Sequence, residues 1–142
     1  MTHYQQLLKI QTTGKSLSTI TSKVQSVVTE SGIKTGLCTI FLRHTSASLL
    51  IQENADPDVL KDLSNFFAKL VPEDGKSYIH DAEGPDDMPA HIRTALTKTS
   101  EQIPIAQGRL LLGTWQGIYL WEHRQRGHYR EVVVHITGSL GA

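Results

Sequence analysis

Apolar and polar positions along the chain follow two different periods, and the period changes near Gly and Pro. Residues 7–12 alternate as a strand at the edge of a sheet does. Residues 21–31 place three valines at helical spacing, and Gly32 stands where such a helix would end. Residues 36–42 are apolar at nearly every position, which is typical of a strand covered on both faces. Residues 48–52 predict another short strand.

The clearest helix start lies at Asp56 and Pro57. Asp is a preferred N-cap residue, and Pro is favoured at the first helical position because its missing N–H would be unpaired there anyway. Pro72 would end this helix. The apolar residues at helical spacing predict one buried face, made of Leu60, Leu63, Phe67 and Leu70.

A second helix is predicted after a long polar loop, residues 72–88. A loop of this length inside a compact domain is usually functional or disordered. The helix would open at Asp86 and Asp87 and run to about Thr99. Its inward-facing residues are predicted to be Ile92, Ala95 and Leu96.

The last part of the chain predicts a meander of three strands, residues 109–115, 118–123 and 129–137. Turns are expected near Gly108 and Gly127. Strands at both ends with helices between them indicate the α+β class rather than repeated βαβ units.

Composition excludes several classes of protein. A chain of 142 residues has the length of a single domain, which we place at residues 1–142. Lys plus Arg and Asp plus Glu are 14 each, so no charge excess favours nucleic acid or an anionic lipid surface. No apolar stretch approaches the roughly 20 residues that span a bilayer, and the N-terminus lacks the pattern of a signal peptide. Cys38 stands alone, which agrees with a cytoplasmic location.

Common catalytic motifs are missing from the sequence. There is no P-loop, no dinucleotide-binding glycine motif, no C-x-x-C and no H-E-x-x-H. Residues 113–117 have the glycine spacing of a nucleophile elbow, but Trp115 stands where the serine must be.

Three histidines form the most promising constellation: His44 at a strand end, His80 in the long loop and His91 in the second helix. Three imidazoles can form an open zinc-type site that keeps one position for water or substrate. Nearby carboxylates could orient the rings, and the candidates are Asp81, Asp86 and Asp87. The alternative is that these histidines are ordinary surface or buried residues.

Other residues are suited to binding a phosphate. The helix that opens at Asp56 presents free backbone amides that could hold an anion, and Arg130 could bind phosphate through two N–H groups unless it only decorates a hairpin. We predict that Thr45, Asn54, Asp56 and Arg130 bind the phosphate of a substrate.

Four segments together resemble the protein family called YjbQ-like or UPF0047. The resemblance runs from about residue 36 to residue 138, and its segments are residues 44–49, 53–58, 83–91 and 113–119. It implies a single domain with a mixed β-sandwich or half-barrel and about three helices, which assembles as a homotrimer. It also implies a weak thiamine-phosphate synthase activity, a transferase reaction that joins hydroxymethylpyrimidine diphosphate and thiazole phosphate.

The resemblance also implies roles for site residues. His44, His80 and His91 would hold a metal or a phosphate, with His80 in addition among the catalytic residues. Glu122 would act as general base or orient another group, and Gln116 would position the substrate.

Metal chemistry leaves the reaction open. Displacing pyrophosphate normally uses Mg²⁺ on oxygen ligands, whereas three imidazoles suit Zn²⁺. We therefore expect a divalent metal, with Zn²⁺ ahead of Mg²⁺. Two alternatives to the synthase reaction are metal-dependent hydrolysis of a small phosphorylated metabolite and a non-catalytic trimeric module that binds a small molecule.

Overall fold

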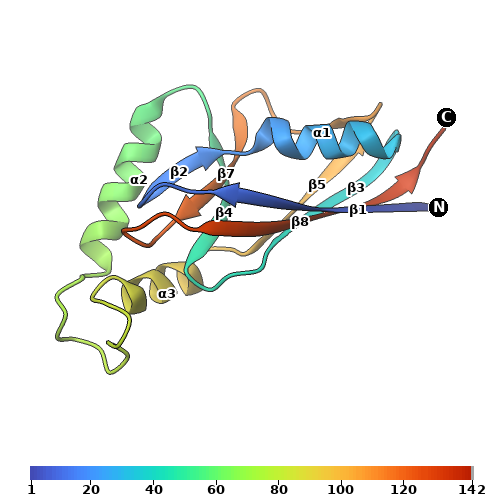
Figure 1. Ribbon diagram of the computed structural model, residues 1–142. Helices are drawn as coiled ribbons and strands as arrows, with labels where there is room; N and C mark the ends of the chain where they lie inside the picture. Colours follow the sequence, from blue (N-terminus) through green and yellow to red (C-terminus); the bar gives the residue numbers. More distant parts are fainter. Residues whose placement is uncertain (142) are drawn as a thin grey trace.

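A computed structural model describes residues 1–141 and contains eight strands and three helices within them (Figure 1). In chain order they are β1 (Thr2–Gln11), β2 (Ser16–Thr19), α1 (Thr21–Ser31), β3 (Thr35–Leu42), β4 (Ala47–Glu53), α2 (Pro57–Leu70), α3 (Asp87–Leu96), β5 (Ser100–Ala106), β6 (Arg109–Leu110), β7 (Gln116–Glu122) and β8 (Tyr129–Ser139). This is the mixed α+β arrangement that the sequence predicts. No helix within residues 1–141 has both the length and the apolar character needed to cross a membrane.

The strands form two antiparallel sheets that together curl into a half-barrel. The larger sheet has the order β1-β8-β3-β5-β6, and the smaller one has the order β2-β7-β4. The predicted meander is wrong, because β7 and β8 belong to different sheets. The first of its strands shrinks to Arg109–Leu110, since the chain then leaves the sheet with Leu111 and Trp115 exposed. The sequence patterns also did not identify β2 or β5.

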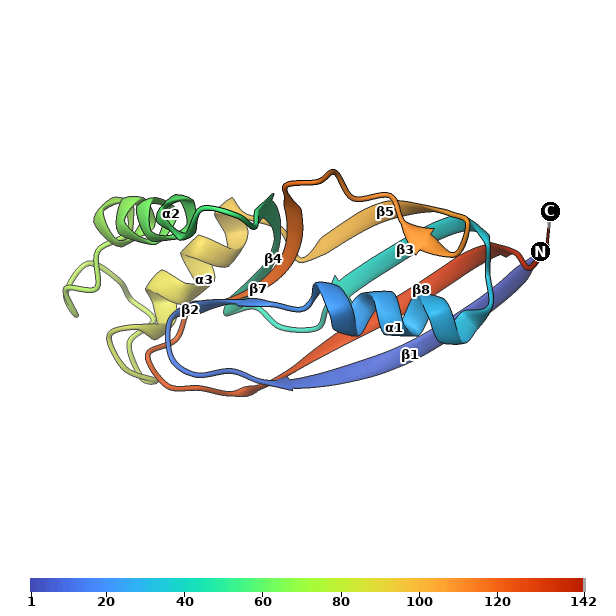
Figure 2. The ribbon, with the colours of Figure 1, turned by 90° about the horizontal axis from the view of Figure 1, so that it is seen from above.

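The core lies between α1 and the inner faces of both sheets, and α1 runs across the larger sheet (Figure 2). The valines of α1 are buried as predicted, and Gly32 ends this helix with a φ of 71°. On β3, however, only alternate side chains reach this core. Leu37 is 38% exposed and Phe41 is 49% exposed, so the prediction that both faces of this strand are covered is wrong for the single chain.

The other two helices lie together at one end of the molecule (Figure 1). Asp56 caps α2 as predicted, because its side chain accepts a hydrogen bond from the Asp58 N–H at 2.9 Å. The α2 helix lies wholly within the described part of the chain, yet none of its residues is buried. The predicted apolar face of this helix is therefore at most partly covered.

In α3 the predicted inward face is also wrong. The buried residues of this helix are Asp87, Pro89, Ala90 and Arg93, whereas Leu96 is exposed. Two of the four buried residues are charged. They can be buried because each has a partner of opposite charge, Glu73 in the loop before α3 and Arg124 in the segment after β7.

Candidate metal centre

The structure brings His80, Asp87 and His91 together. One ligand atom from each residue lies within 4.8 Å of the other two. Asp87 and His91 are four residues apart and therefore share one face of α3, and His80 reaches them from the preceding loop. His80 Nε2 lies 2.7 Å from Asp87 Oδ2, and His91 Nε2 lies 3.2 Å from the same oxygen. We refer to these three residues as the histidine cluster.

The proton positions on His91 follow from its partners. Its Nδ1 lies 2.8 Å from the Thr45 carbonyl oxygen, which can only accept a hydrogen bond, so Nδ1 carries the proton. In a neutral ring Nε2 then carries a lone pair instead of a proton, and this lone pair faces the Asp87 carboxylate oxygen. Such an arrangement is repulsive unless a proton or a metal cation lies between the two atoms. A backbone carbonyl on the other ring nitrogen is also how metal-binding histidines are usually oriented.

Asp87 provides a buried negative charge at the centre of the cluster. It is 1% exposed, and its Oδ1 forms an ion pair with Arg124 Nη1 at 2.9 Å. Burial by itself would raise the pKa of Asp87, but the hydrogen bond from His80 and the charge of Arg124 lower it. The carboxylate is therefore ionised. One oxygen is held by Arg124, and the other faces the two imidazoles.

Arg124 also connects this carboxylate to the loop before α3. Its Nε donates to Asp86 Oδ2 at 2.9 Å, and its Nη2 donates to the Glu83 carbonyl oxygen at 3.0 Å. One guanidinium thus bonds two neighbouring carboxylates and the loop backbone. The orientation of Asp87 depends directly on this side chain.

The donor set fits a transition metal. Two imidazoles and one carboxylate bind Zn²⁺ in open catalytic sites, and a similar set binds non-haem Fe(II). Both histidine side chains are partly exposed, so water or a substrate could reach the remaining coordination positions.

An open cleft of about 540 Å³ adjoins the cluster. It shares Glu83 and Arg124 with the surroundings of Asp87, and Glu83 Oε2 lies 3.9 Å from His80 Nε2. Arg126 and His128 also line the cleft, and Arg126 is exposed. The guanidinium of Arg126 is therefore open to an anionic group beside the cluster.

His44, predicted as a metal ligand, is outside the cluster, and Asp87 takes the third position instead. Its Nε2 accepts a hydrogen bond from the Glu131 N–H at 2.8 Å, so this lone pair is already used. Its Nδ1 lies 3.4 Å from Arg130 Nη1. Burial and the charge of Arg130 lower the pKa of His44, which keeps the ring neutral. The adjacent Thr45 contributes its backbone carbonyl rather than its side chain.

Glu122 and Arg130 form a buried ion pair with both charged groups fully bonded. Arg130 Nε donates to Glu122 Oε1 at 2.8 Å, and its Nη2 donates to Oε2. Thr12 Oγ1 and the Arg124 N–H also donate to this carboxylate, at 2.6 and 3.1 Å. Burial alone would raise the pKa of Glu122, but these donors lower it. The geometry therefore supports neither a general base at Glu122 nor a phosphate ligand at Arg130.

The remaining predicted residues lie at the opposite end of β7. Gln116 begins this strand and Glu122 ends it, so six steps of about 3.3 Å, roughly 20 Å, separate them. Gln116 Oε1 accepts a hydrogen bond from the Gly113 N–H at 2.8 Å, and Asn54 Nδ2 donates to the Gln116 carbonyl oxygen at 3.3 Å. Asp56 caps α2 nearby. Within one chain these residues do not join the histidine cluster.

Comparisons with known proteins agree with the motifs. Residues 6–139 match the family model described as UPF0047 protein YjbQ-like. The chain belongs to the UPF0047 (YjbQ-like) family. A UPF0047 protein of Synechocystis is 69% identical over 137 residues, which cover 96% of this chain and 93% of that protein. The UPF0047 protein YjbQ of Escherichia coli O157:H7 is 39% identical over 96% of this chain and 99% of its own length.

Solved structures of UPF0047 relatives share the fold. A YjbQ/UPF0047 family protein of Clostridium acetobutylicum is 40% identical, has a TM-score of 0.82, and the match covers 94% of this chain and 99% of that one. A protein of Sulfolobus solfataricus described as of unknown function is 26% identical with a TM-score of 0.85, covering 97% and 100%.

The sequence patterns of this UPF0047 chain did not identify Asp87 as a ligand of the cluster. Asp87 was expected only to orient a histidine. Its spacing of four residues from His91 on a predicted helix was a usable signal, because residues at that spacing face the same side. Arg124 had no comparable signal, since its contacts join residues about forty positions apart in the chain.

Proposed function

We propose that this chain binds one divalent transition-metal ion, preferably Zn²⁺, at His80, Asp87 and His91, and that it hydrolyses a small phosphorylated metabolite there. The observation that carries the proposal is the 3.2 Å contact between Asp87 Oδ2 and His91 Nε2. Because Nδ1 of this ring donates to the Thr45 carbonyl, the contact needs a cation or a second proton.

The ligand chemistry favours Zn²⁺ over Mg²⁺. Imidazole nitrogens suit Zn²⁺ and related metals, whereas Mg²⁺ prefers a nearly octahedral set of oxygens. A bound ion of this type supplies a Lewis acid for a phosphoryl oxygen and lowers the pKa of water. The protein itself supplies the fixed carboxylate and the oriented ring of His91.

The adjoining cleft suits a small anionic substrate. Its volume of about 540 Å³ lies in the range of small-molecule sites. Asp86 and the Glu83 carbonyl already bond Arg124, so the exposed guanidinium of Arg126 is the group best placed to bind a phosphate. A substrate held there would present its phosphate near the histidine cluster.

The thiamine-phosphate synthase reaction stays a prediction from the family resemblance. Pyrophosphate displacement calls for Mg²⁺ and several cations on the phosphates, and the cluster offers two nitrogens and one carboxylate oxygen. The hydrolase is therefore the better supported reaction. A non-catalytic binding module can be told from the hydrolase and from the synthase because it would form no product.

We also propose that the chain forms a homotrimer through the outer face of its larger sheet. Leu7 and Phe41 both pair with Val133 of the strand between them, which makes a continuous apolar stripe on a face that no helix covers. Sedimentation measurements of the wild type and of Phe41→Lys test this. A trimer that Phe41→Lys dissociates is expected, whereas a monomeric wild type would exclude it.

The test of the function starts with metal content. Untagged protein is analysed by mass spectrometry beside His91→Ala and His135→Ala, the latter a histidine on the outer face of the sheet. We expect about one metal ion per chain in the wild type and in His135→Ala, and none in His91→Ala. Metal-free wild type that fails to take up Zn²⁺ would exclude the site.

Turnover is then measured with a panel of phosphate esters. Zn²⁺-loaded wild type and His135→Ala should release phosphate, and His91→Ala should not. Stoichiometric metal without turnover of any ester would exclude the hydrolase and favour the binding module. Formation of thiamine phosphate from its two precursors, without ester hydrolysis, would favour the synthase.

A further inference from the structure

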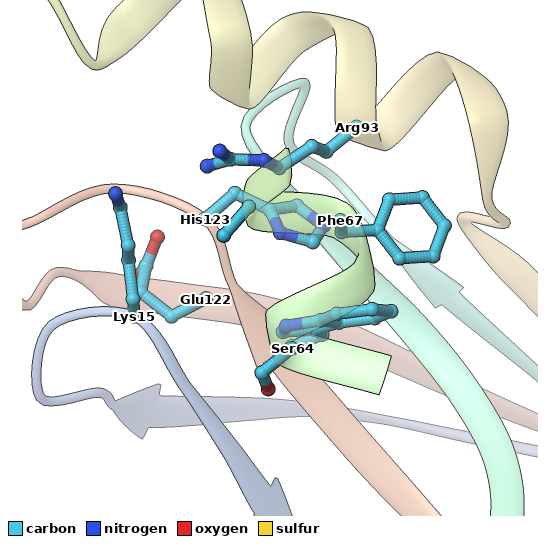
Figure 3. A pocket seen from close by; sticks show the side chains of 8 residues that line it. Lys15, Ser64, Phe67, Arg93, Glu122 and His123 are labelled. Atoms are coloured by element: carbon cyan, nitrogen blue, oxygen red, sulfur yellow. The ribbon is translucent and has the colours of Figure 1, made fainter. Parts of the chain in front are cut away.

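A second pocket lies on the other side of α3 from the histidine cluster. Its volume is about 70 Å³, and it is enclosed by α2, α3, the end of β7 and the turn between β1 and β2 (Figure 3). Phe67 and Trp121 form apolar walls, with their rings 5.1 Å apart. Lys15 and Arg93 bring positive charge to the pocket from two different elements.

Arg93, which lines this pocket, has a buried N–H without a partner. The residue is 4% exposed. Its Nη1 donates to Glu73 Oε2 at 2.7 Å and its Nη2 donates to the Val71 carbonyl oxygen at 2.9 Å. Its Nε is buried and has no hydrogen-bond partner among residues 1–141. Buried N–H groups without partners are rare in native proteins, and a guanidinium N–H calls for an acceptor.

The charges around the pocket leave room for an anion. Lys15 pairs with Glu73, which already accepts from Arg93, so the ammonium group of Lys15 keeps two further N–H groups. Hydrogen bonds from Lys15 and Arg93 lower the pKa of Glu73 although burial acts to raise it. The other carboxylate at the wall, Glu122, is neutralised by Arg130. The cations of Lys15, Arg93 and Arg130 thus outnumber the two carboxylates with which they pair.

The buried imidazole of His123 adds no charge. Burial and the nearby Arg93 lower the pKa of this ring to about 3, so it is neutral. Its Nε2 lies 2.8 Å from Ser48 Oγ, a hydroxyl that also contacts Thr97 Oγ1. The ring is thereby fixed as a rigid polar wall, and the positive charge stays on Lys15 and Arg93.

We propose that this pocket binds a small oxyanion, a single phosphate or carboxylate group, which accepts from Arg93 Nε–H and Lys15 Nζ. The pocket has a volume of about 70 Å³ and can hold one such group. Apolar walls strengthen charge-assisted hydrogen bonds because they exclude water. The site is independent of the metal proposal, since Arg93 and His91 are two residues apart and face different sides of α3.

The direct test follows the Arg93 Nε–H resonance by NMR. Isotope-labelled protein is titrated with inorganic phosphate and, in a second arm, with acetate, at constant ionic strength. A saturable shift with either anion supports the site and identifies which group it takes. No shift of this resonance up to about 50 mM of both anions, which covers millimolar dissociation constants, would mean that only water fills the pocket and would overturn the proposal.

Two variants at partly or fully exposed positions make the test specific without disturbing the fold. Lys15→Gln removes one donor and should weaken binding about tenfold, the effect of one charge-assisted hydrogen bond. Ala68→Trp, on the exposed side of α2, should block the pocket. Lys69→Gln removes a charge from the same helix outside the pocket and should bind as the wild type does.

If both pocket variants bind as the wild type does, the shift arises elsewhere and the proposal fails. Metal content is measured on the same samples. Ala68→Trp should keep its metal, so a failure of this inference and a failure of the metal site are distinguishable.

Discussion

Two polar clusters of this protein are built on buried carboxylates and have opposite properties. Glu122 is 0% exposed, and its oxygens receive four hydrogen bonds from Arg130, Thr12 and the backbone of Arg124. Asp87 is almost as buried, but one of its oxygens faces two imidazoles, and on His91 the facing nitrogen has no proton in the neutral ring. A carboxylate surrounded by fixed donors stabilises the fold, whereas one that faces an unprotonated imidazole nitrogen can share a ligand with it.

The difference comes from where the partners are located. Arg130 is itself buried and lies on a strand of the larger sheet, so its position is fixed by packing. His80 lies in the exposed loop between α2 and α3. A rigid donor completes a structural ion pair, while a partly exposed imidazole leaves room for an ion or a substrate. Variants of the Glu122–Arg130 pair should therefore change the free energy of unfolding, whereas variants around the histidine cluster should change metal affinity.

The largest effect is expected from Arg130→Met. This variant leaves the Glu122 carboxylate buried without its cation, which should lower the free energy of unfolding by about 3–5 kcal/mol. Urea denaturation measures the loss. The double variant Arg130→Met/Glu122→Gln should recover a large part of it because no buried charge is left alone. A single variant as stable as the wild type would show that the pair is not structural.

Acid should destabilise the protein before its carboxylates titrate. Burial and Arg93 lower the pKa of His123 to about 3. His123 therefore takes up a proton near pH 6.5 in the unfolded chain but stays unprotonated at this pH in the folded protein. The free energy of unfolding should then fall by about 1.4 kcal/mol per pH unit from about pH 6 to 4.5. His44, whose pKa is also lowered, acts in the same direction.

Urea denaturation at several pH values measures this slope. His123→Gln, which keeps a polar group for Ser48, should show a clearly smaller slope than the wild type. Equal slopes in the two proteins would contradict the assignment of a neutral buried ring.

Arg124→Gln should weaken the histidine cluster without emptying it. Loss of the cation paired with Asp87 Oδ1 leaves the carboxylate less firmly oriented, and such outer partners are typically worth 10–100-fold in metal affinity. Competition with a fluorescent zinc chelator measures the change. Arg126→Gln, an exposed neighbour in the same cleft, should bind Zn²⁺ as the wild type does. Equal loss in both variants would point to a general electrostatic effect.

The smallest effect is expected on the stability of His91→Ala. In the presence of a chelator, the free energy of unfolding should change by less than about 0.5 kcal/mol, because the ring is partly exposed and contributes little packing. Thermal unfolding of the metal-free proteins measures it. A loss above about 2 kcal/mol would make His91 a structural residue of the same kind as Arg130.

Local features of the fold could be predicted from the sequence, and long-range ones could not. Gly32 ends α1 and Asp56 caps α2 because these signals act within a few residues. Strand partners are different, because each residue of β8 pairs with residues at least 90 positions away in the chain. The same limit applies to side-chain burial in α3, where Arg93 is buried only because Glu73 and Val71 of the preceding loop accept its hydrogen bonds.

The candidate site was predicted in part for the same reason. His80 and His91 lie close to Asp87 in the sequence, and all three residues come together. His44 lies outside the cluster, and its Nε2 accepts a hydrogen bond from the backbone of Glu131, 87 residues away in the chain. Gln116 and Glu122 lie close in sequence, yet an extended strand separates them.

The position of β8 between β1 and β3 has a consequence for biosynthesis. This strand is translated after both strands that it joins. Until it has been made, the edges of β1 and β3 that will pair with it stay unpaired. The larger sheet cannot close by adding strands in order of synthesis, because the strand that joins β1 to β3 is made last. Such long-range closure slows folding and exposes the nascent chain to wrong pairings. A β1 strand that waits for β8 is the segment on which we expect chaperones to act.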